Sequence, residues 1–393
     1  MNDSFRSQLK RFQVGLLVLG AVALAASGVG ALGNVKQFFF SYLFGVLFWL
    51  GLSLGCMMVT MIHQLTGGRW GYPTRRILEA AFSTLPLMLL LFVPIFFGLQ
   101  HLYPWADPSE VALDPALHGR HLYQNTYGFV IRTVIFFGIM LWMGAVLRKN
   151  SLAQDATTDA EPTRKARFLS GPGVVIYVLA ATYAYVDWIL SLEKHWYSTM
   201  FPIIIVIGQI LNAYAFSILM MILLRKQPPI VNVATKEQFH QLGTLLFTFV
   251  LFWTYISFGQ LLIIYSGDLP AEISWYLHRI AGGWKVLLGA IALFHFFLPF
   301  FLLLFRSVKK RVASLGALAA LLFLMRMVDM YWLVMPSFHE KGLVVHWMDF
   351  AAIIGVGAVW AAFFLWRLMA APLLPVHDPG MQFAFVYAHG DQR

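Results

Sequence analysis

Ten apolar runs, each about 20 residues or longer, constrain this 393-residue chain more than any motif does. A helix needs about 20 apolar residues to cross a hydrocarbon core about 30 Å thick. The runs cover residues 12–32, 38–63, 79–100, 123–147, 172–192, 198–224, 239–265, 281–305, 313–335 and 347–371. Because 60% of the residues are hydrophobic and only 12% are charged, a soluble globule is excluded. The sequence therefore predicts an all-α polytopic membrane protein with one integral membrane domain over residues 1–393.

The basic residues are distributed unevenly between the two sides of the predicted bundle. Lys and Arg near the ends of spans stay on the cytoplasmic side of a membrane. One side holds the groups at 148–167 and 306–311, whereas the loops on the other side carry few. We therefore expect both termini, including a short tail at 372–393, to lie in the cytoplasm. The net charge of +10 then reflects topology and does not indicate nucleic acid as a partner.

Cofactor-binding motifs are absent from the sequence. The single cysteine, Cys56, lies in the second span, which excludes an intrachain disulfide, a CxxCH haem-attachment site and a cysteine-ligated iron-sulfur cluster. No span carries the paired histidines expected for haem or metal ligation. We therefore expect no covalently bound cofactor and no metal. Any redox chemistry would use a diffusible or partner-borne cofactor, so the chain is not expected to catalyse a reaction alone.

An internal repeat relates spans two to five to spans six to nine. The segment from Phe40, FSYLFGVLFWLG, resembles the segment from Tyr197, YSTMFPIIIVIG. Spans four and eight each end with an arginine, and spans five and nine each contain a Val-Asp pair. The shared order of these matches predicts two parallel copies, at about 38–192 and 198–335. Each copy would form a four-helix bundle, with spans one and ten flanking the two.

Ionisable side chains within the spans are the candidate functional residues. A charge at the membrane centre costs about 2.5 to 3.5 kcal/mol on insertion scales, so it is seldom retained without a partner or a purpose. The predicted orientation places one group in the outer half or near the middle, namely Arg132, Asp187, Lys285, His295, Arg326, Asp329 and Asp349. His63 and Glu79 lie toward the inner side. We interpret these residues as a proton path that is dense on the outer side and thin at the centre.

A purely structural role is the alternative for each candidate. Arg326 and Asp329, spaced i and i+3, lie on one helix face and can neutralise each other. Asp187 has no such neighbour, so its partner must come from another helix, with Arg132 and Lys285 as the candidates. This asymmetry makes Asp187 the better candidate for a titrating group. For His295, the alternative is a ring nitrogen satisfied by a backbone carbonyl.

One long segment resembles a known family. Residues Tyr185 to Pro202, YVDWILSLEKHWYSTMFP, resemble a signature of the F-type membrane subunit of bacterial alternative complex III, a quinol:electron-acceptor oxidoreductase. Further resemblances follow in LFWLGLSLGCMMVTMIHQLTGGRWG, FFLPFFLLLFRSVKKR, RMVDMYWLVMP and LLPVHDP. Lys194 and Pro202 stand where a proline and a glycine are more usual. That family is similar to the NrfD and polysulfide-reductase type of membrane anchor.

The resemblance implies a subunit of two four-helix bundles without redox centres of its own. Its partners would be a homologous membrane subunit and periplasmic subunits that carry haem c and iron-sulfur clusters. Quinone or quinol is the cofactor expected near it, and its contribution would be quinone-side structure and a transmembrane proton path in a respiratory or photosynthetic chain. Two alternatives stay open: an anchor of another NrfD-type oxidoreductase, and a free-standing secondary transporter, which also places ions between repeats.

Overall fold

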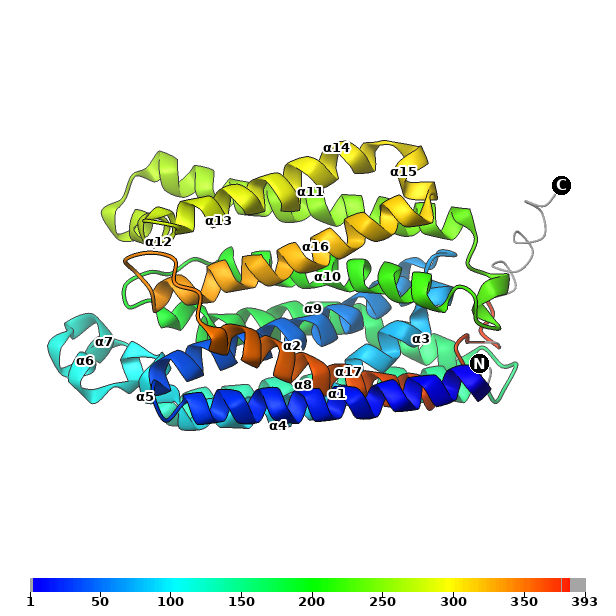
Figure 1. The fold of residues 1–393 in the computed structure, drawn as a ribbon, viewed down its shortest axis with the longest axis horizontal. Coiled ribbons are helices and arrows are strands. Elements are labelled where there is room, and N and C mark those ends of the chain that lie inside the picture. Colours follow the sequence, from blue (N-terminus) through cyan, green and yellow to red (C-terminus); the bar gives the residue numbers. More distant parts are fainter. Residues whose placement is uncertain (1–2, 376, 382–393) are drawn as a thin grey trace.

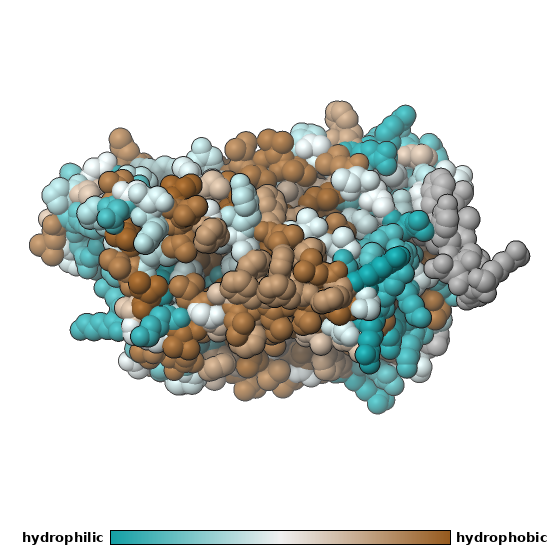
Figure 2. Space-filling view, turned by 90° about the horizontal axis from the view of Figure 1, so that it is seen from above, coloured by the Kyte–Doolittle hydropathy of each residue, from teal (hydrophilic) through white to brown (hydrophobic). Residues whose placement is uncertain are grey.

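The computed structural model describes residues 3–375 and 377–381, and within them the chain folds into helices without a strand (Figure 1). Ten helical segments of these residues are long and apolar enough to cross a membrane, one for each predicted run. On the face shown in Figure 2, hydrophobic side chains form an apolar belt across the middle of the molecule, while hydrophilic side chains gather toward its two ends. The predicted class, an all-α polytopic membrane protein, is confirmed. The last residues of the predicted tail, 382–393, and residue 376 lie outside the described residues.

The first five spans occupy the first half of the chain. They are α1 (Asp3–Gly30), α2 (Val35–Thr66), α3 (Gly71–Phe82) with α4 (Leu85–Phe97), α8 (Thr126–Gln154) and α9 (Glu161–Trp188). Short helices connect them: α5 (Leu99–Leu102), η1 (Pro104–Ala106), α6 (Pro108–Leu113), α7 (Pro115–Gly119) and η2 (Leu190–Leu192). Span three is divided because Pro86, in the first turn of α4, has no N–H with which to continue α3.

The remaining five spans follow the same scheme. They are α10 (Phe201–Leu224), α11 (Lys236–Gly267), α13 (Trp284–Ala290) continued by η4 (Ile291–Phe297) and α14 (Leu298–Leu304), α16 (Val312–Val334) and α17 (Trp347–Met369). The connecting helices are η3 (Ile230–Asn232), α12 (Pro270–Ile280), α15 (Arg306–Lys310) and η5 (Met335–Ser337). The segment η4 is a turn of π-helix within span eight.

One predicted loop is much shorter than expected. The predicted apolar runs end at residue 147 and resume at residue 172, but α8 runs to Gln154 and α9 begins at Glu161, so only six residues, 155–160, separate the two helices. Polar residues are no obstacle to a helix once it has left the apolar part of the membrane, and Pro162 fits the first turn of α9. The two helices therefore project past the apolar belt.

The helices pack as two groups of four with a flanking pair. The first group is α2, α3–α4, α8 and α9, and the second is α10, α11, α13–η4–α14 and α16. The helices α1 and α17 lie along each other, and α17 packs against α2 (Figure 1). This is the predicted arrangement of two four-helix bundles flanked by spans one and ten, whereas the sequence repeat itself stays a prediction.

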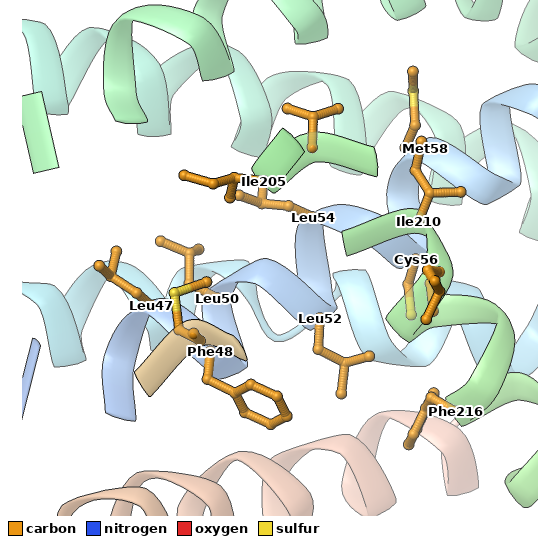
Figure 3. Packing of buried hydrophobic residues seen from close by; sticks show 14 of the residues in the cluster. Leu47, Phe48, Leu50, Leu52, Leu54, Cys56, Met58, Ile205, Ile210 and Phe216 are labelled. Atoms are coloured by element: carbon orange, nitrogen blue, oxygen red, sulfur yellow. The ribbon is translucent and has the colours of Figure 1, made fainter. Parts of the chain in front are cut away.

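The two groups meet where α2 packs against α10. Leu47, Leu50 and Leu54 of α2 belong to the same buried cluster as Ile205 and Ile210 of α10, and Leu54 lies beside Ile205 (Figure 3). At Gly55 the backbones come so close that a Cβ atom would lie 2.2 Å from the carbonyl oxygen of Gln209. Only glycine allows this approach.

Two ends of the molecule are named for what they carry. The terminal face holds the start of α1 and the end of α17, and the loop face is the opposite end, with segments 98–125, 189–200, 268–283 and 335–346 (Figure 1). In the predicted orientation the terminal face is cytoplasmic.

Candidate functional site

The first Val-Asp pair forms an ion pair between two helices near the loop face. Arg132 of α8 donates from Nε to Oδ2 of Asp187 at 2.6 Å and from Nη2 to Oδ1 at 3.0 Å. The side chain of Asp187 is 3% exposed and that of Arg132 is 24% exposed. The guanidinium also lies 3.9 Å from the ring centre of Tyr123. Of the two predicted partners, Arg132 is therefore correct, and Lys285 is exposed at the start of α13.

The aspartate of the second Val-Asp pair has a partner on its own helix, and this ion pair is more completely buried than the first. Arg326 and Asp329, both 3% exposed, form the i, i+3 ion pair that their spacing predicts on α16. The guanidinium packs on Gly208 of α10, where a Cβ atom would come within 2.3 Å of its central carbon. The Nε atom of Arg326 has no hydrogen-bond partner among the described residues. A buried donor without a partner lowers the free energy of unfolding. The pair therefore contains one hydrogen-bonding group, Arg326 Nε, whose burial is not compensated.

His295 faces the same interior from the π-helix η4. Its side chain is fully buried, and the centre of its ring lies 4.2 Å from the ring centre of Trp253 of α11. Neither ring nitrogen has a hydrogen-bond partner within the described part of the chain, so the expected backbone carbonyl is not there. The helix α16, which carries Arg326, packs against η4. Single π-turns occur frequently at functional sites, and here one places an unpartnered imidazole beside a buried ion pair.

Neutral polar side chains lie where the proton path predicted from ionisable residues is thin. The hydroxyl of Tyr177 donates to Oε1 of Gln209 at 2.8 Å, and Nε2 of Gln209 donates to the hydroxyl of Tyr185. Gln209 follows Gly208, the residue on which Arg326 packs. The three side chains thus bridge α9 of the first bundle and α10 of the second. A search for ionisable residues misses them, although an amide within the apolar run FPIIIVIGQILN was a detectable signal.

Asp349, at the start of α17, has a different environment from the two Val-Asp carboxylates. It accepts hydrogen bonds from Gln37 Nε2 at 3.0 Å, Ser41 Oγ at 2.5 Å, the Tyr331 hydroxyl at 3.0 Å and the His346 backbone N–H at 2.8 Å. No ion pair joins it to a cation among the described residues. The contact with His346 is a helix-capping box, so Asp349 also stabilises the start of α17.

The Asp349 cluster reaches the surface through His339. Nε2 of His339 lies 3.1 Å from Oε1 of Gln37, and this amide oxygen can only accept, so the ring nitrogen donates. Burial lowers the pKa of His339 below its ordinary value of 6.5, although the charge of Asp349 raises it. The imidazole is half-buried and therefore connects the buried carboxylate with the loop face.

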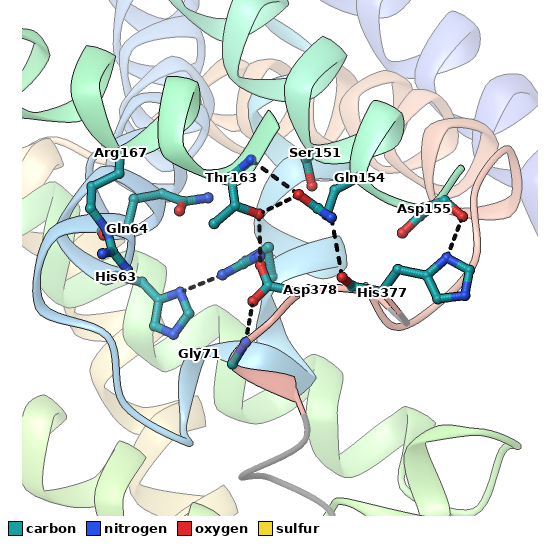
Figure 4. Close-up of polar contacts among 12 residues, drawn as sticks. His63, Gln64, Gly71, Ser151, Gln154, Asp155, Thr163, Arg167, His377 and Asp378 are labelled. Carbon is teal, nitrogen blue, oxygen red and sulfur yellow. Dashed lines mark hydrogen bonds and ion pairs between the residues drawn. The ribbon is translucent and has the colours of Figure 1, made fainter. Parts of the chain in front are cut away.

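His63 lies in a polar cluster at the terminal face (Figure 4). Its Nδ1 atom is 3.2 Å from Nη2 of Arg75, and its Nε2 atom is 2.9 Å from the carbonyl oxygen of Gly68. Because a guanidinium only donates and a carbonyl only accepts, His63 is the neutral tautomer with its proton on Nε2. Arg75 in turn pairs with Asp378, which the sequence reasoning did not single out because it lies in the polar tail beyond the last span.

Glu79 belongs to a second terminal-face cluster. Its carboxylate accepts from Arg76 Nη1 at 2.8 Å and from the hydroxyl of Ser151. Arg76 also donates to Asp155 at 2.5 Å. Burial raises the pKa of Asp155 above its ordinary value, and the Arg76 charge only partly offsets this. Asp155 is 17% exposed, so it connects the buried Glu79 with the surface.

Two cavities open at the opposite end of the molecule, the loop face. The first, of about 300 Å³, lies next to Val186 and is lined by aromatic side chains that include Tyr123, Trp196 and Tyr197. The second, of about 320 Å³, contains charged side chains of both signs, among them Lys36, Glu110 and Glu193. No set of three or more His, Cys, Asp or Glu side chains in residues 3–375 and 377–381 is arranged to hold a metal ion.

Together, the fold and its buried polar clusters define a multi-span helical membrane protein with a charged interior. No protein-family model matches the chain, and no curated protein matches its sequence. The buried residues are therefore the basis for inferring what the protein does.

Proposed function

We propose that this chain is an integral membrane subunit of a quinol:electron-acceptor oxidoreductase of the alternative complex III type, and that its second bundle carries protons. The observation that supports this most is the pair Arg326–Asp329 beside His295. A buried carboxylate and an imidazole with two unused nitrogens supply the proton-binding groups that a relay needs within a membrane, and the adjacent guanidinium supplies a fixed positive charge. Bulky apolar residues would fill the same space at lower cost if packing were the sole requirement.

The other clusters extend this site toward both faces. Tyr177, Gln209 and Tyr185 form a hydrogen-bonded row at the first bundle's side of Arg326. The Glu79–Asp155 and His63–Arg75 clusters are the candidates for proton uptake at the terminal face, and Asp349 with His339 is the candidate for release at the loop face. Lys285 has no part in this route, because it is exposed at the start of α13. Arg132 and Asp187 serve mainly to join α8 to α9.

The redox part of the proposal depends on partners. The chain would dock against a homologous membrane subunit and periplasmic subunits that carry haem c and iron-sulfur clusters. The aromatic cavity beside Val186 is the part of this chain best suited to a quinone ring, because it is mostly apolar and opens at the loop face. The bacterial inner membrane and a cytoplasmic terminal face belong to the same proposal, supported by the basic residues near the ends of the spans.

A free-standing secondary transporter is the second candidate, favoured by the position of Arg326–Asp329 between helices of the second bundle close to its contact with the first. Affinity purification of the tagged chain from its native membrane distinguishes the two. The proposal predicts co-purified subunits with c-type haem absorbance and quinol-dependent reduction of a haem acceptor. Recovery of the chain alone, or only with further copies of itself, would contradict it and favour the transporter.

A further inference from the structure

A groove opens at the terminal face between the end of α10 and the start of α16. Its volume is about 520 Å³. It is lined by Leu219, Ile222, Leu223, Arg225, Val312, Ala313 and Gly316. All of these are apolar except Arg225, so the groove has hydrocarbon-like walls with one cation at its rim.

Small residues of α16 create the groove. Gly316 packs on Ile222, where a Cβ atom would lie 2.9 Å from the Cδ1 methyl group. Ala313, one turn earlier, is exposed and leaves space above it. Leu223 on the opposite wall is 68% exposed. Both walls belong to segments apolar enough to cross a membrane, so lipid chains surround them at this depth.

Arg225 gives the rim of the groove a positive charge. It is half-buried, and no acidic side chain pairs with it within residues 3–375 and 377–381. Lys226 follows it in the sequence, and Arg311 is the N-cap residue of α16. Lys309 and Lys310 lie instead toward α11, where Lys309 is over the ring of Phe247 and Lys310 pairs with Glu237 at 3.2 Å. The rim therefore carries the charge of Arg225 at the end of α10, where phospholipid headgroups lie in the predicted orientation.

We propose that this groove binds an anionic phospholipid, with an acyl chain along Leu219, Ile222 and Gly316 and the phosphate against Arg225. Basic pockets between helices at the cytoplasmic side suit such headgroups, because the phosphate is charged and the chains are apolar. The first turn of α16 lies beside the groove, since Val312 and Ala313 line it and Arg311 gives the helix no side-chain cap. A zwitterionic lipid has the same phosphate, but its own cation offsets the attraction to Arg225.

Native mass spectrometry of the full-length chain in detergent tests the site with phosphatidylglycerol as the probe. Phosphatidylcholine and inorganic phosphate serve as comparison ligands. The proposal predicts retention of phosphatidylglycerol, with weaker retention of phosphatidylcholine and none of free phosphate. Equal retention of the two lipids would overturn the charge-based assignment. Retention of free phosphate alone would overturn the lipid assignment.

Two variants localise the binding. Arg225→Gln should weaken phosphatidylglycerol binding about fivefold, because one basic side chain near an anionic headgroup contributes about 1 kcal/mol. Ala313→Trp should block the groove and abolish the same adduct while leaving the fold intact, since Ala313 is exposed. The matched controls are Arg11→Gln and Ala25→Trp, at exposed positions of α1. Wild-type binding in both groove variants, or equal losses in the controls, would show that the lipid does not occupy this groove.

Discussion

The two Val-Asp pairs have the same sequence motif but different surroundings. Asp187 accepts from two N–H groups of Arg132, Nε and Nη2, and the Arg132 side chain comes from a neighbouring helix and is 24% exposed. Asp329 is held by Arg326 of its own helix, and both side chains are 3% exposed. The first pair has its hydrogen bonds satisfied, whereas the second leaves Arg326 Nε unpartnered and lies close to an unpartnered His295.

This difference reverses the ranking of the two carboxylates that the sequence predicts. Asp187 was the better candidate for titration because it had no partner on its own helix. Its bidentate ion pair with Arg132 joins α8 to α9 and satisfies both of its oxygens. Asp329 lies beside groups with unused hydrogen-bonding capacity, so it is the better candidate for function.

Removing the charge of Asp329 should have the largest effect on stability. Asp329→Asn leaves Arg326 buried without a counter-charge, so we expect the free energy of unfolding to fall by about 3 to 5 kcal/mol. Denaturant titration of the detergent-solubilised chain measures this. The double variant Arg326→Met with Asp329→Leu should recover most of the loss, because apolar residues need no partner. A full-sized loss in the double variant would show that the pair is needed for packing.

The corresponding change in the first bundle should cost less. Asp187→Asn leaves Arg132 able to reach solvent or headgroups and to stay on the Tyr123 ring. We expect the free energy of unfolding to fall by about 1 to 2 kcal/mol in the same titration. A loss equal to that of Asp329→Asn would remove the contrast between the two pairs.

His295 should show the opposite sign. Phenylalanine has a similar size and removes two buried nitrogens that have no partner, so His295→Phe should raise the free energy of unfolding by about 1 kcal/mol. Proton release coupled to quinol turnover should nevertheless decrease. A destabilised variant with normal proton release would assign the imidazole a structural role.

A small effect of pH on stability is expected from His339, which donates to Gln37 beside the carboxylate of Asp349. Because burial lowers the pKa of this imidazole in the folded state, the unfolded chain binds the proton first. The stability present above pH 6.5 should therefore decrease as the pH falls below 6.5, by about 1 kcal/mol or less. His339→Gln should flatten this part of a stability profile against pH. An unchanged slope in the variant would assign the effect to other groups.

The sequence predicted the architecture because each membrane span requires a long apolar run, which is visible in the sequence. It also predicted the pair Arg326–Asp329, since i, i+3 spacing on a helix fixes proximity. It narrowed the partner of Asp187 to two residues but could not choose between them, because that depends on how α8 and α9 pack. The sequence did not predict the cluster of Tyr177, Gln209 and Tyr185, because burying a neutral side chain in a membrane costs less free energy than burying a charge. Their contacts also join different helices, so they depend on packing.

We expect Asp329, held by Arg326, to carry protons, whereas Arg132 and Asp187 join helices. The most direct test compares Arg326→Met/Asp329→Leu with Arg132→Met/Asp187→Leu in the assembled complex in liposomes, by counting protons released for each quinol oxidised. The first variant should assemble and lose the transmembrane share of the protons, while the second should release protons as the wild type does. Unchanged proton release in the first variant, or equal losses in both, would contradict the claim.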